Sequence, residues 1–184
     1  MKKVIGFSAS PRKGNTDTLI KQALIGAETA GAKTKFYKIN DLNIKGCQSC
    51  FYCRSHDVCA VKDDMQEIYE DLRDADAVVI GSPIYFFQAA GQLKIFLDRL
   101  YPMVGDDKGD FRYGQKKGVL IFSQGSSKPA NYQTGIDMTK TVVEYMGIDV
   151  ADTIVFTKAD GVTDASNNEE ALQKALEAGK KLVG

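Results

Sequence analysis

Residues 4–16 read VIGFSASPRKGNT, and this stretch determines how the rest of the chain is interpreted. The apolar run from Val4 to Phe7 predicts a buried strand, and a helical pattern begins near Asn15. The connection between them is rich in hydroxyl groups and cations, and it leads into a helix whose first turn offers free N–H groups and the positive end of its dipole. It therefore predicts a phosphate site, whose candidate residues are Ser8, Ser10, Arg12, Asn15 and Thr16.

Two missing glycine motifs indicate that this turn binds a monophosphate and not a pyrophosphate. Neither G-x-x-x-x-G-K-[ST] nor G-x-G-x-x-G occurs in it, and a pyrophosphate site would need those glycines. A terminal monophosphate can instead be wrapped by side chains, as in flavodoxin-like folds that hold FMN. The alternative is an ordinary polar connection in which Asn15 or Thr16 caps the helix.

Strand and helix patterns alternate along the rest of the chain. Five such pairs indicate a parallel sheet covered by helices on both faces. Gly31 and Gly147 stand where helices should stop. The expected strands are 3–7, 34–39, 77–81, 118–122 and 152–156, and the expected helices are 15–30, 64–74, 89–103, 132–146 and 168–183.

Composition excludes several classes of function. With 184 residues, of which 43% are hydrophobic, residues 1–184 are expected to form a single domain. The 24 basic and 24 acidic residues balance, so no nucleic acid or membrane partner is expected. The first residues do not read as a signal peptide and no apolar run is long enough to cross a membrane, which predicts a cytoplasmic protein.

All four cysteines lie in one long connection, an insertion at about residues 40–63. Their spacing, C-x2-C-x2-C-x5-C, is typical of a [4Fe–4S] cluster and is tighter than structural zinc sites usually are. Zinc, a redox disulfide and free thiols remain alternatives, and His56 in the same loop is expected to be exposed. A second long connection spans residues 104–117. The candidate metal ligands are Cys47, Cys50, Cys53 and Cys59.

Two further strand ends carry candidate ligand-binding loops. Pro83 is expected to stop the third strand, and the apolar side chains after it could form a wall for a flat ring. The fourth strand ends in small polar residues that let backbone amides approach a ring edge. Plain core packing, a subunit contact and an ordinary turn are the alternatives. The candidate residues are Ser82, Pro83, Ile84, Tyr85 and Phe86 after the third strand, and Ser123 and Gly125 after the fourth.

With these motifs in place, the chain resembles the iron–sulfur flavoproteins of the flavodoxin-like superfamily, the branch that also contains NADPH-dependent FMN reductases. The resemblance spans the whole chain, and the combination of its motifs is more specific than any one of them. The matching residues are 8–16, 46–59 with 63–65, 82–85, and 92–94 with 98–99.

This resemblance implies a flavodoxin-like three-layer α/β sandwich with a five-stranded parallel sheet in the order 2-1-3-4-5. It also implies FMN at the residues named above, a [4Fe–4S] cluster on the four cysteines, and a homodimer or homotetramer. The expected activity passes electrons between flavin and cluster, with NAD(P)H as a possible donor and no catalytic side chain. The alternatives are a cluster-free NAD(P)H-dependent reductase of FMN or quinones, and a non-enzymatic FMN carrier.

Overall fold

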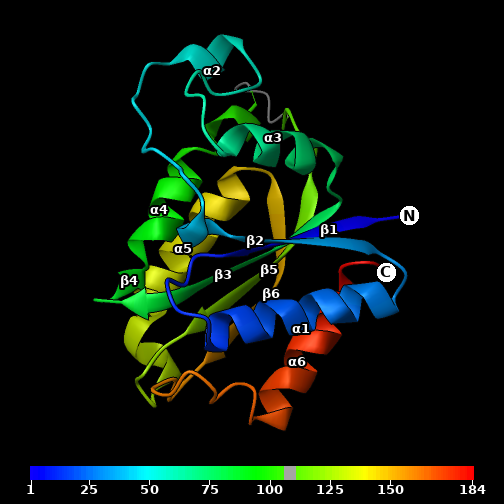
Figure 1. The fold of residues 1–184 in the computed structure, drawn as a ribbon, viewed down its shortest axis with the longest axis vertical. Coiled ribbons are helices and arrows are strands. Elements are labelled where there is room, and N and C mark those ends of the chain that lie inside the picture. Colours follow the sequence, from blue (N-terminus) through cyan, green and yellow to red (C-terminus); the bar gives the residue numbers. More distant parts are fainter. Residues whose placement is uncertain (106–110) are drawn as a thin grey trace.

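A sheet with helices on both faces forms the centre of the protein (Figure 1). The computed structural model describes residues 1–105 and 111–184. Five parallel strands lie in the order β2-β1-β3-β5-β6, and a short strand, β4, pairs antiparallel with β3. Counted along the chain, the parallel strands have the order 2-1-3-4-5, so the expected flavodoxin-like topology is confirmed and β4 is an addition to it.

The helices and strands follow the predicted alternation, with small shifts at their ends. Gly31 and Gly147 adopt positive φ angles of 92° and 86° directly after two helices, as expected for C-terminal stops. The strands are β1 (Lys3–Ser8), β2 (Lys33–Lys38), β3 (Ala77–Tyr85), β4 (Gln88–Ala89), β5 (Lys116–Ser123) and β6 (Ile148–Phe156). The helices are α1 (Asn15–Thr29), α2 (Tyr52–Ser55), α3 (Met65–Asp74), α4 (Gly91–Asp98), α5 (Gln133–Tyr145) and α6 (Glu169–Lys181), with 3-10 turns η1 (Ile39–Asp41), η2 (Tyr101–Met103) and η3 (Pro129–Tyr132).

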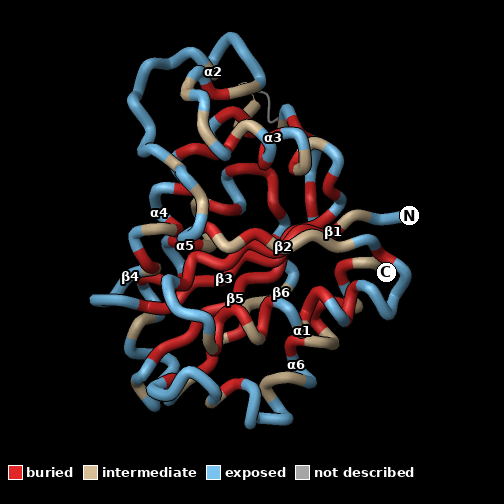
Figure 2. Tube along the Cα trace, viewed as in Figure 1, coloured by how far each residue is buried: buried red, intermediate tan, exposed pale blue. Residues whose placement is uncertain are grey.

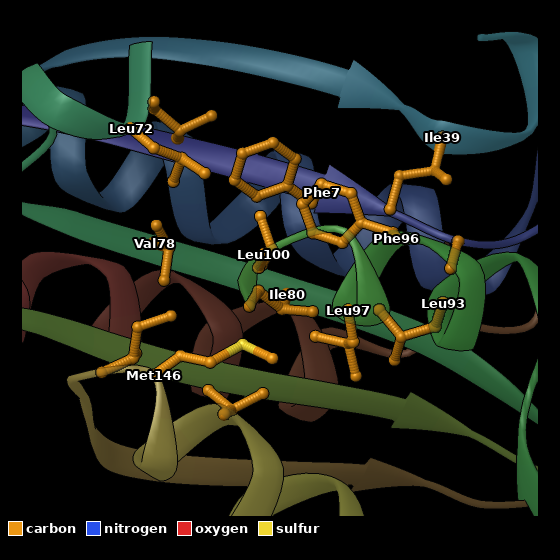
Figure 3. Packing of buried hydrophobic residues seen from close by; sticks show 14 of the residues in the cluster. Phe7, Ile39, Leu72, Val78, Ile80, Leu93, Phe96, Leu97, Leu100 and Met146 are labelled. Atoms are coloured by element: carbon orange, nitrogen blue, oxygen red, sulfur yellow. The ribbon is translucent and has the colours of Figure 1, made fainter. Parts of the chain in front are cut away.

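Each face of the sheet has its own hydrophobic core, because successive side chains of a strand point to opposite faces. Ile5 and Phe7 of β1 lie with α3, α4 and α5, whereas Val4 lies with α1 and α6. Figure 3 shows Phe7 beside Phe96 of α4. The central strands β1, β3 and β5 are mostly buried, and the cysteine-containing loop is largely exposed (Figure 2).

Several element ends differ from the sequence-based expectation. Pro83 does not stop β3, which continues to Tyr85. Pro83 still lies opposite Ser123 of β5, but β1 ends at Ser8 opposite Gly81, so on the β1 side no strand needs the N–H that Pro83 lacks. The helix expected over residues 89–103 is shorter, because residues 88–89 form β4 and Pro102 breaks the turn after α4.

Strand β6 begins at Ile148, four residues before the expected start. A bulge explains the difference, since Gly118 pairs with Val150 and Val119 with Asp152, which leaves Ala151 as the extra residue. As a result, Ile148 and Val150 lie in one core, whereas Ile154 and Phe156 lie in the core on the other face of the sheet.

Two further expectations concern the helices and the second long connection. None of the described helices is long and apolar enough to cross a membrane. The expected long connection at 104–117 is described only in part, because residues 106–110 lie outside the described residues.

Candidate functional site

The carboxyl ends of three neighbouring strands bring the predicted phosphate loop and both predicted ring loops to one edge of the sheet. Ser8 lies opposite Gly81 at the end of β1, and Pro83 lies opposite Ser123 at the end of β5. A hydrogen bond of 2.8 Å joins the hydroxyls of Thr16 and Ser123, so helix α1 is tied directly to the loop after β5. The three loops are therefore neighbours, as an open α/β sheet requires of a ligand crevice.

The hydroxyls of the phosphate loop, defined as residues 8–16, already have partners within the protein. The buried Ser8 donates its hydroxyl hydrogen to the carboxylate of Asp17. Ser10 accepts from the backbone N–H of Arg12 at 3.2 Å and donates to its carbonyl at 2.9 Å. These bonds shape the loop, and they leave the guanidinium of Arg12 exposed.

The loop after β6 supports the phosphate loop from outside. The amide of Asn15 donates to the carbonyl of Gly161 at 2.7 Å and accepts from the N–H of Ala165 at 2.9 Å. A Cβ atom at Gly14 would come within 3.2 Å of the carbonyl oxygen of Val162, so the two loops pack closely. The sequence pattern did not indicate this contact, because these loops are almost 150 positions apart.

Asp17 and Lys38 are two buried charges beside the loop that the sequence analysis missed. The ammonium group of Lys38 lies 2.6 Å from the carboxylate of Asp17, and both side chains are about one tenth exposed or less. The same ammonium donates to the carbonyl of Arg12 at 2.9 Å. Lys38 therefore neutralises Asp17 and holds the tip of the loop.

The first turn of α1 offers backbone N–H groups that no described side chain caps. It starts from Gly14 without a side-chain cap, whereas Asn168 caps α6 by accepting from the N–H of Ala171 at 2.9 Å. Arg12 and Lys13 are exposed just before this turn. Uncapped N–H groups, the helix dipole and two exposed cations together favour a negatively charged group here.

The loop after β3 is a tight hairpin with aromatic residues at its tip. Phe86 and Phe87 have φ angles of 48° and 71°, a conformation that side chains other than glycine rarely adopt. Phe86 is 96% exposed, while the ring of Phe87 packs edge-on against that of Tyr132 with ring centroids 5.4 Å apart. Strained residues of this kind concentrate at functional sites.

The other predicted ring-wall residues are less accessible. Ile84 is buried in the core, and Tyr85 is partly exposed at the end of β3. The buried hydroxyl of Ser82 donates to the carbonyl of Pro83 and accepts from the N–H of Ala90, at 2.8 and 2.9 Å, which closes the hairpin. Contact of Ser82, Pro83, Ile84, Tyr85 and Phe86 with a flavin ring stays a prediction.

The loop after β5 has little room for larger side chains. A Cβ atom at Gly125 would lie 2.9 Å from the carboxylate of Asp160. Gln124 is buried beside it, and its Oε1 atom has no hydrogen-bond partner among the described residues. Gln124 was not among the candidates, although it stands between two of them in the sequence.

The four cysteines line one cavity, at the opposite end of the α4 and α5 helices from the phosphate loop. The cavity measures about 390 Å³, and its walls are mainly apolar. The C-terminal ends of α4 and α5 form the far wall, and both helices begin at the sheet edge described above (Figure 1). The residues around the cavity are Cys47, Gln48, Ser49, Cys50, Phe51, Cys53, Cys59, Leu97, Asp98, Tyr101, Val142, Tyr145 and Met146.

The backbone of this loop turns sharply around Cys50. Ser49 and Phe51 on either side of it have φ angles of 51° and 57°. The N–H of Ser49 points to the sulfur of Cys47 at 3.4 Å. A strained turn and an N–H directed at a sulfur atom both suit a loop that presents thiolates to a shared centre.

The thiols are close enough to affect one another electrostatically. Burial raises the pKa of the Cys53 thiol, and the charges of Cys59, Cys47 and Cys50 raise it further. None of the cysteines forms a disulfide. Across residues 1–105 and 111–184, however, no three His, Cys, Asp or Glu side chains are grouped so that they could hold one metal ion. His56 is exposed, as expected, and stacks on Tyr52.

Comparison with known proteins identifies the family. A family model described as NADPH-dependent FMN reductase matches residues 2–161, so the chain belongs to this family of flavin-dependent oxidoreductases. The resemblance seen in the sequence is thereby confirmed.

Curated relatives extend this result. An iron-sulfur flavoprotein of Methanocaldococcus jannaschii is 30% identical, over 98% of this chain and 95% of the relative. An iron-sulfur flavoprotein of Archaeoglobus fulgidus is 38% identical over 64% of this chain, but the match spans only 60% of that relative. An FMN-dependent NADH:quinone oxidoreductase of Burkholderia lata is 30% identical over 73% of this chain and 77% of the relative.

Solved structures confirm the fold. An NAD(P)H:quinone oxidoreductase from Methanothermobacter marburgensis superposes with a TM-score of 0.77, at 19% identity and 98% coverage of both chains. An archaeal flavodoxin superposes with a TM-score of 0.62, at 16% identity and coverage of 98% of this chain and 96% of the other. At these identities the structures bear on the fold alone.

Proposed function

We propose that this chain is an FMN-dependent oxidoreductase that also carries a [4Fe–4S] cluster and passes electrons between the two groups, with NAD(P)H as a possible donor. The observation that carries the proposal is that all four cysteines line one cavity. When bound, the flavin exchanges hydride or single electrons and the cluster exchanges one electron at a time. The task of the protein is to hold both groups and tune their potentials.

For the flavin, the support comes from the family and from the edge of the sheet. The uncapped first turn of α1 and the exposed Arg12 suit the terminal phosphate of FMN. We infer that backbone N–H groups and Arg12 bind the phosphate, while the hydroxyls of Ser8, Ser10 and Thr16 mainly hold the loop in shape. The hairpin tip and the loop at 123–126 would border the ring.

For the cluster, the residues present fit the group. Four thiols, apolar walls and an N–H directed at sulfur are the surroundings that iron–sulfur clusters use. A single zinc ion would need each thiolate sulfur about 2.3 Å from the metal. The described side chains form no group that could hold one ion in this way. The four ligands of a cluster stand farther apart than those of a single ion, and Cys47, Cys50, Cys53 and Cys59 would hold it.

A cluster-free NAD(P)H-dependent reductase of FMN or quinones is the second candidate. It is favoured by the lack of a ready single-ion site among the described residues and by relatives named as quinone oxidoreductases. In that case the cysteines would be free thiols. The expected homodimer or homotetramer remains a prediction in either case, and analytical ultracentrifugation would test it.

An anaerobic visible spectrum combined with iron and sulfide assays separates the candidates. The proposal expects flavin bands together with broad cluster absorption and about four irons and four sulfides per chain. Flavin bands without iron, even after anaerobic reconstitution, would reject the cluster and support the second candidate. Loss of the flavin bands from correctly folded protein would reject both.

A further inference from the structure

A fully buried arginine at the end of α4 binds both ends of the cysteine loop. The guanidinium of Arg99 donates to the carbonyl of Lys45 at 2.6 Å, before the first cysteine, and to that of Val61 at 3.3 Å, after the last one. It also pairs with the carboxylate of Asp63 at 2.6 and 3.0 Å, and both side chains are completely buried. We call Arg99, Asp63 and the two carbonyls the Arg99 clamp.

Asp63 completes the connection between the two ends. Its carboxylate accepts from the backbone N–H of Lys45 at 3.0 Å. Lys45 is therefore held by its N–H and by its carbonyl at the same time. The clamp is itself fixed to the core, because the hydroxyl of Tyr69 on α3 donates to the backbone carbonyl of Arg99 at 2.7 Å.

Stability alone does not explain such a pair. Burying two charges costs more than packing apolar side chains of similar size, and the Nε–H of Arg99 has no partner among the described residues. By contrast, a planar guanidinium can bind two carbonyls and a carboxylate in one fixed arrangement, which an ammonium cannot do. Positioning the loop is the advantage that this geometry offers.

The clamp lies next to the thiols. Burial alone would lower the pKa of Arg99, but Asp63, Tyr69 and Cys59 together hold it above its usual value, so the guanidinium keeps its charge close to Cys59. Cys59 is also the most buried of the four cysteines and belongs to the same core as Tyr69.

We propose that Arg99 is the positioning residue of the cysteine centre, holding the two ends of the loop together so that the thiols share one cavity before any metal is bound. This inference rests on the proposed function only where it assigns the cysteines to a cluster. Arg99 acts on the loop through Lys45, Val61 and Asp63 and is not itself a ligand.

The test is limited trypsin digestion of metal-free protein, with mass spectrometry to follow cleavage after Lys45 and Lys62. Arg99→Lys keeps a positive charge next to Asp63 but loses the planar guanidinium that binds Lys45, Val61 and Asp63 together. We therefore expect cleavage about tenfold faster than in the parent, which is the scale of one lost charged hydrogen bond. The double variant Arg99→Met with Asp63→Leu removes both charges without leaving one buried alone, and it should be cleaved at least as fast as Arg99→Lys.

A matched control and a second readout keep the result decisive. Lys94→Met lies on the exposed face of the same helix and removes only its surface pair with Asp98, so it should be cleaved at the parent rate. Urea unfolding measures global stability in every variant. Parent-like cleavage of both Arg99 variants, or an increase fully accounted for by lower global stability, would overturn the proposal.

Iron retention links the clamp to the cluster. After anaerobic reconstitution, Arg99→Lys should lose iron to a chelator about tenfold faster than the parent, because looser loop ends release the thiolates more often. If the parent takes up no iron, the cluster assignment fails while the trypsin result still decides on the clamp. If iron leaves both proteins at the same rate, the clamp does not position the centre.

Discussion

A carboxylate in the first turn of a helix that should bind phosphate would repel that anion, and the structure places Asp17 there. Lys38 resolves the conflict, since its ammonium pairs with Asp17 and also donates to the carbonyl of Arg12. Ser8 binds the other carboxylate oxygen. The phosphate loop is thus held by the Asp17–Lys38 ion pair, whose charges cancel. Arg12 and Lys13 then supply the net positive charge of the loop.

The first prediction concerns Arg12. Arg12→Ala should weaken FMN binding by about 1 to 3 kcal/mol, because a charged hydrogen bond to the phosphate is lost. Titration of the apoprotein with FMN measures the dissociation constant. Lys33→Ala, an exposed lysine at the amino end of β2, serves as the control and should bind FMN like the parent. Equal affinities for Arg12→Ala and the parent would contradict the phosphate site.

The second prediction concerns the buried pair. Lys38→Met should destabilise the fold by about 3 to 5 kcal/mol, because Asp17 would remain buried without a counter-charge. Adding Asp17→Asn should recover most of this loss, since no charge is then left unpaired. Urea unfolding of the two variants and the parent tests the idea, and equal losses in the single and double variants would contradict it.

At the scale of single residues, the sequence was informative about types and local spacing only. The connection between β1 and α1, the gathering of the four cysteines around one cavity and the exposed His56 could be predicted from a few consecutive positions, and phosphate binding stays a prediction. The partners of Asp17 and Arg99 could not, because Lys38 and Asp63 lie 21 and 36 positions away and meet them only in the folded chain. Buried charges carry no periodic signal that would indicate their partners.

Helices α1 and α6 show how closely two elements can approach. A Cβ atom at Gly26 would lie 2.0 Å from the carbonyl oxygen of Leu176, and one at Gly179 would lie 1.8 Å from that of Ala23. Both glycines therefore allow backbone contact where the helices cross. The amphipathic pattern predicted two helices on the sheet but not their mutual contact.

The third prediction follows from this crossing. Gly179→Ala should lower the stability by about 1 to 3 kcal/mol, because the added methyl group forces the helices apart. Thermal or urea unfolding measures the change. Gly91→Ala is the matched control, since a Cβ atom there would have nothing within 4 Å. A Gly179→Ala variant as stable as this control would show that the crossing adapts without cost.

The fourth prediction concerns the contact between β2 and α3. Asp71 accepts hydrogen bonds from Lys3, Lys35 and Tyr37. Burial works against its charge, but these bonds lower the pKa of Asp71 to about 2. The folded value lies below the unfolded value of about 3.9, so the stabilisation is complete above that pH and is lost as the pH falls through about 2.

Comparison with Asp71→Asn isolates this effect from other acids. Urea unfolding between pH 6 and pH 2 should show a constant stability difference between parent and variant above about pH 5. The difference should shrink towards pH 2, where the parent also loses the charge. A difference that does not change with pH would contradict this assignment.

Element order was predictable because the apolar runs and helical spacing are regular. The exceptions each have a local cause: the bulge at Ala151 interrupts the alternation of β6, Pro83 lies where its missing N–H is not needed, and β4 is too short to leave a pattern. The hairpin tip is a further case, since two phenylalanines replace the glycine or asparagine that such turns usually contain.

On the scale of the whole molecule, the two proposed cofactor sites lie at opposite ends of α4 and α5. These helices have eight and thirteen residues, which corresponds to about 12 and 20 Å at 1.5 Å per residue. No described hydrogen bond of a cysteine side chain reaches the phosphate loop. The two sites should therefore be loaded independently.

The fifth prediction tests this independence. Cys50→Ser should remove or convert the cluster and slow transfer to one-electron acceptors, while FMN binds as in the parent. Flavin titration, iron analysis and reduction of a one-electron acceptor measure the three effects. Ser55→Ala, an exposed hydroxyl in the same loop, is the control. Parent-like electron transfer in Cys50→Ser would mean that the cysteines are not a redox centre.

The Arg99 clamp also has a consequence for how such chains diverge over generations. A single substitution at an exposed cysteine such as Cys47 or Cys50 discards a thiol and disturbs little of the core. A single substitution at Arg99 leaves Asp63 charged inside the core, so it is tolerated only if a second change follows. Descendants that lose their thiols should therefore still inherit the arginine and the aspartate.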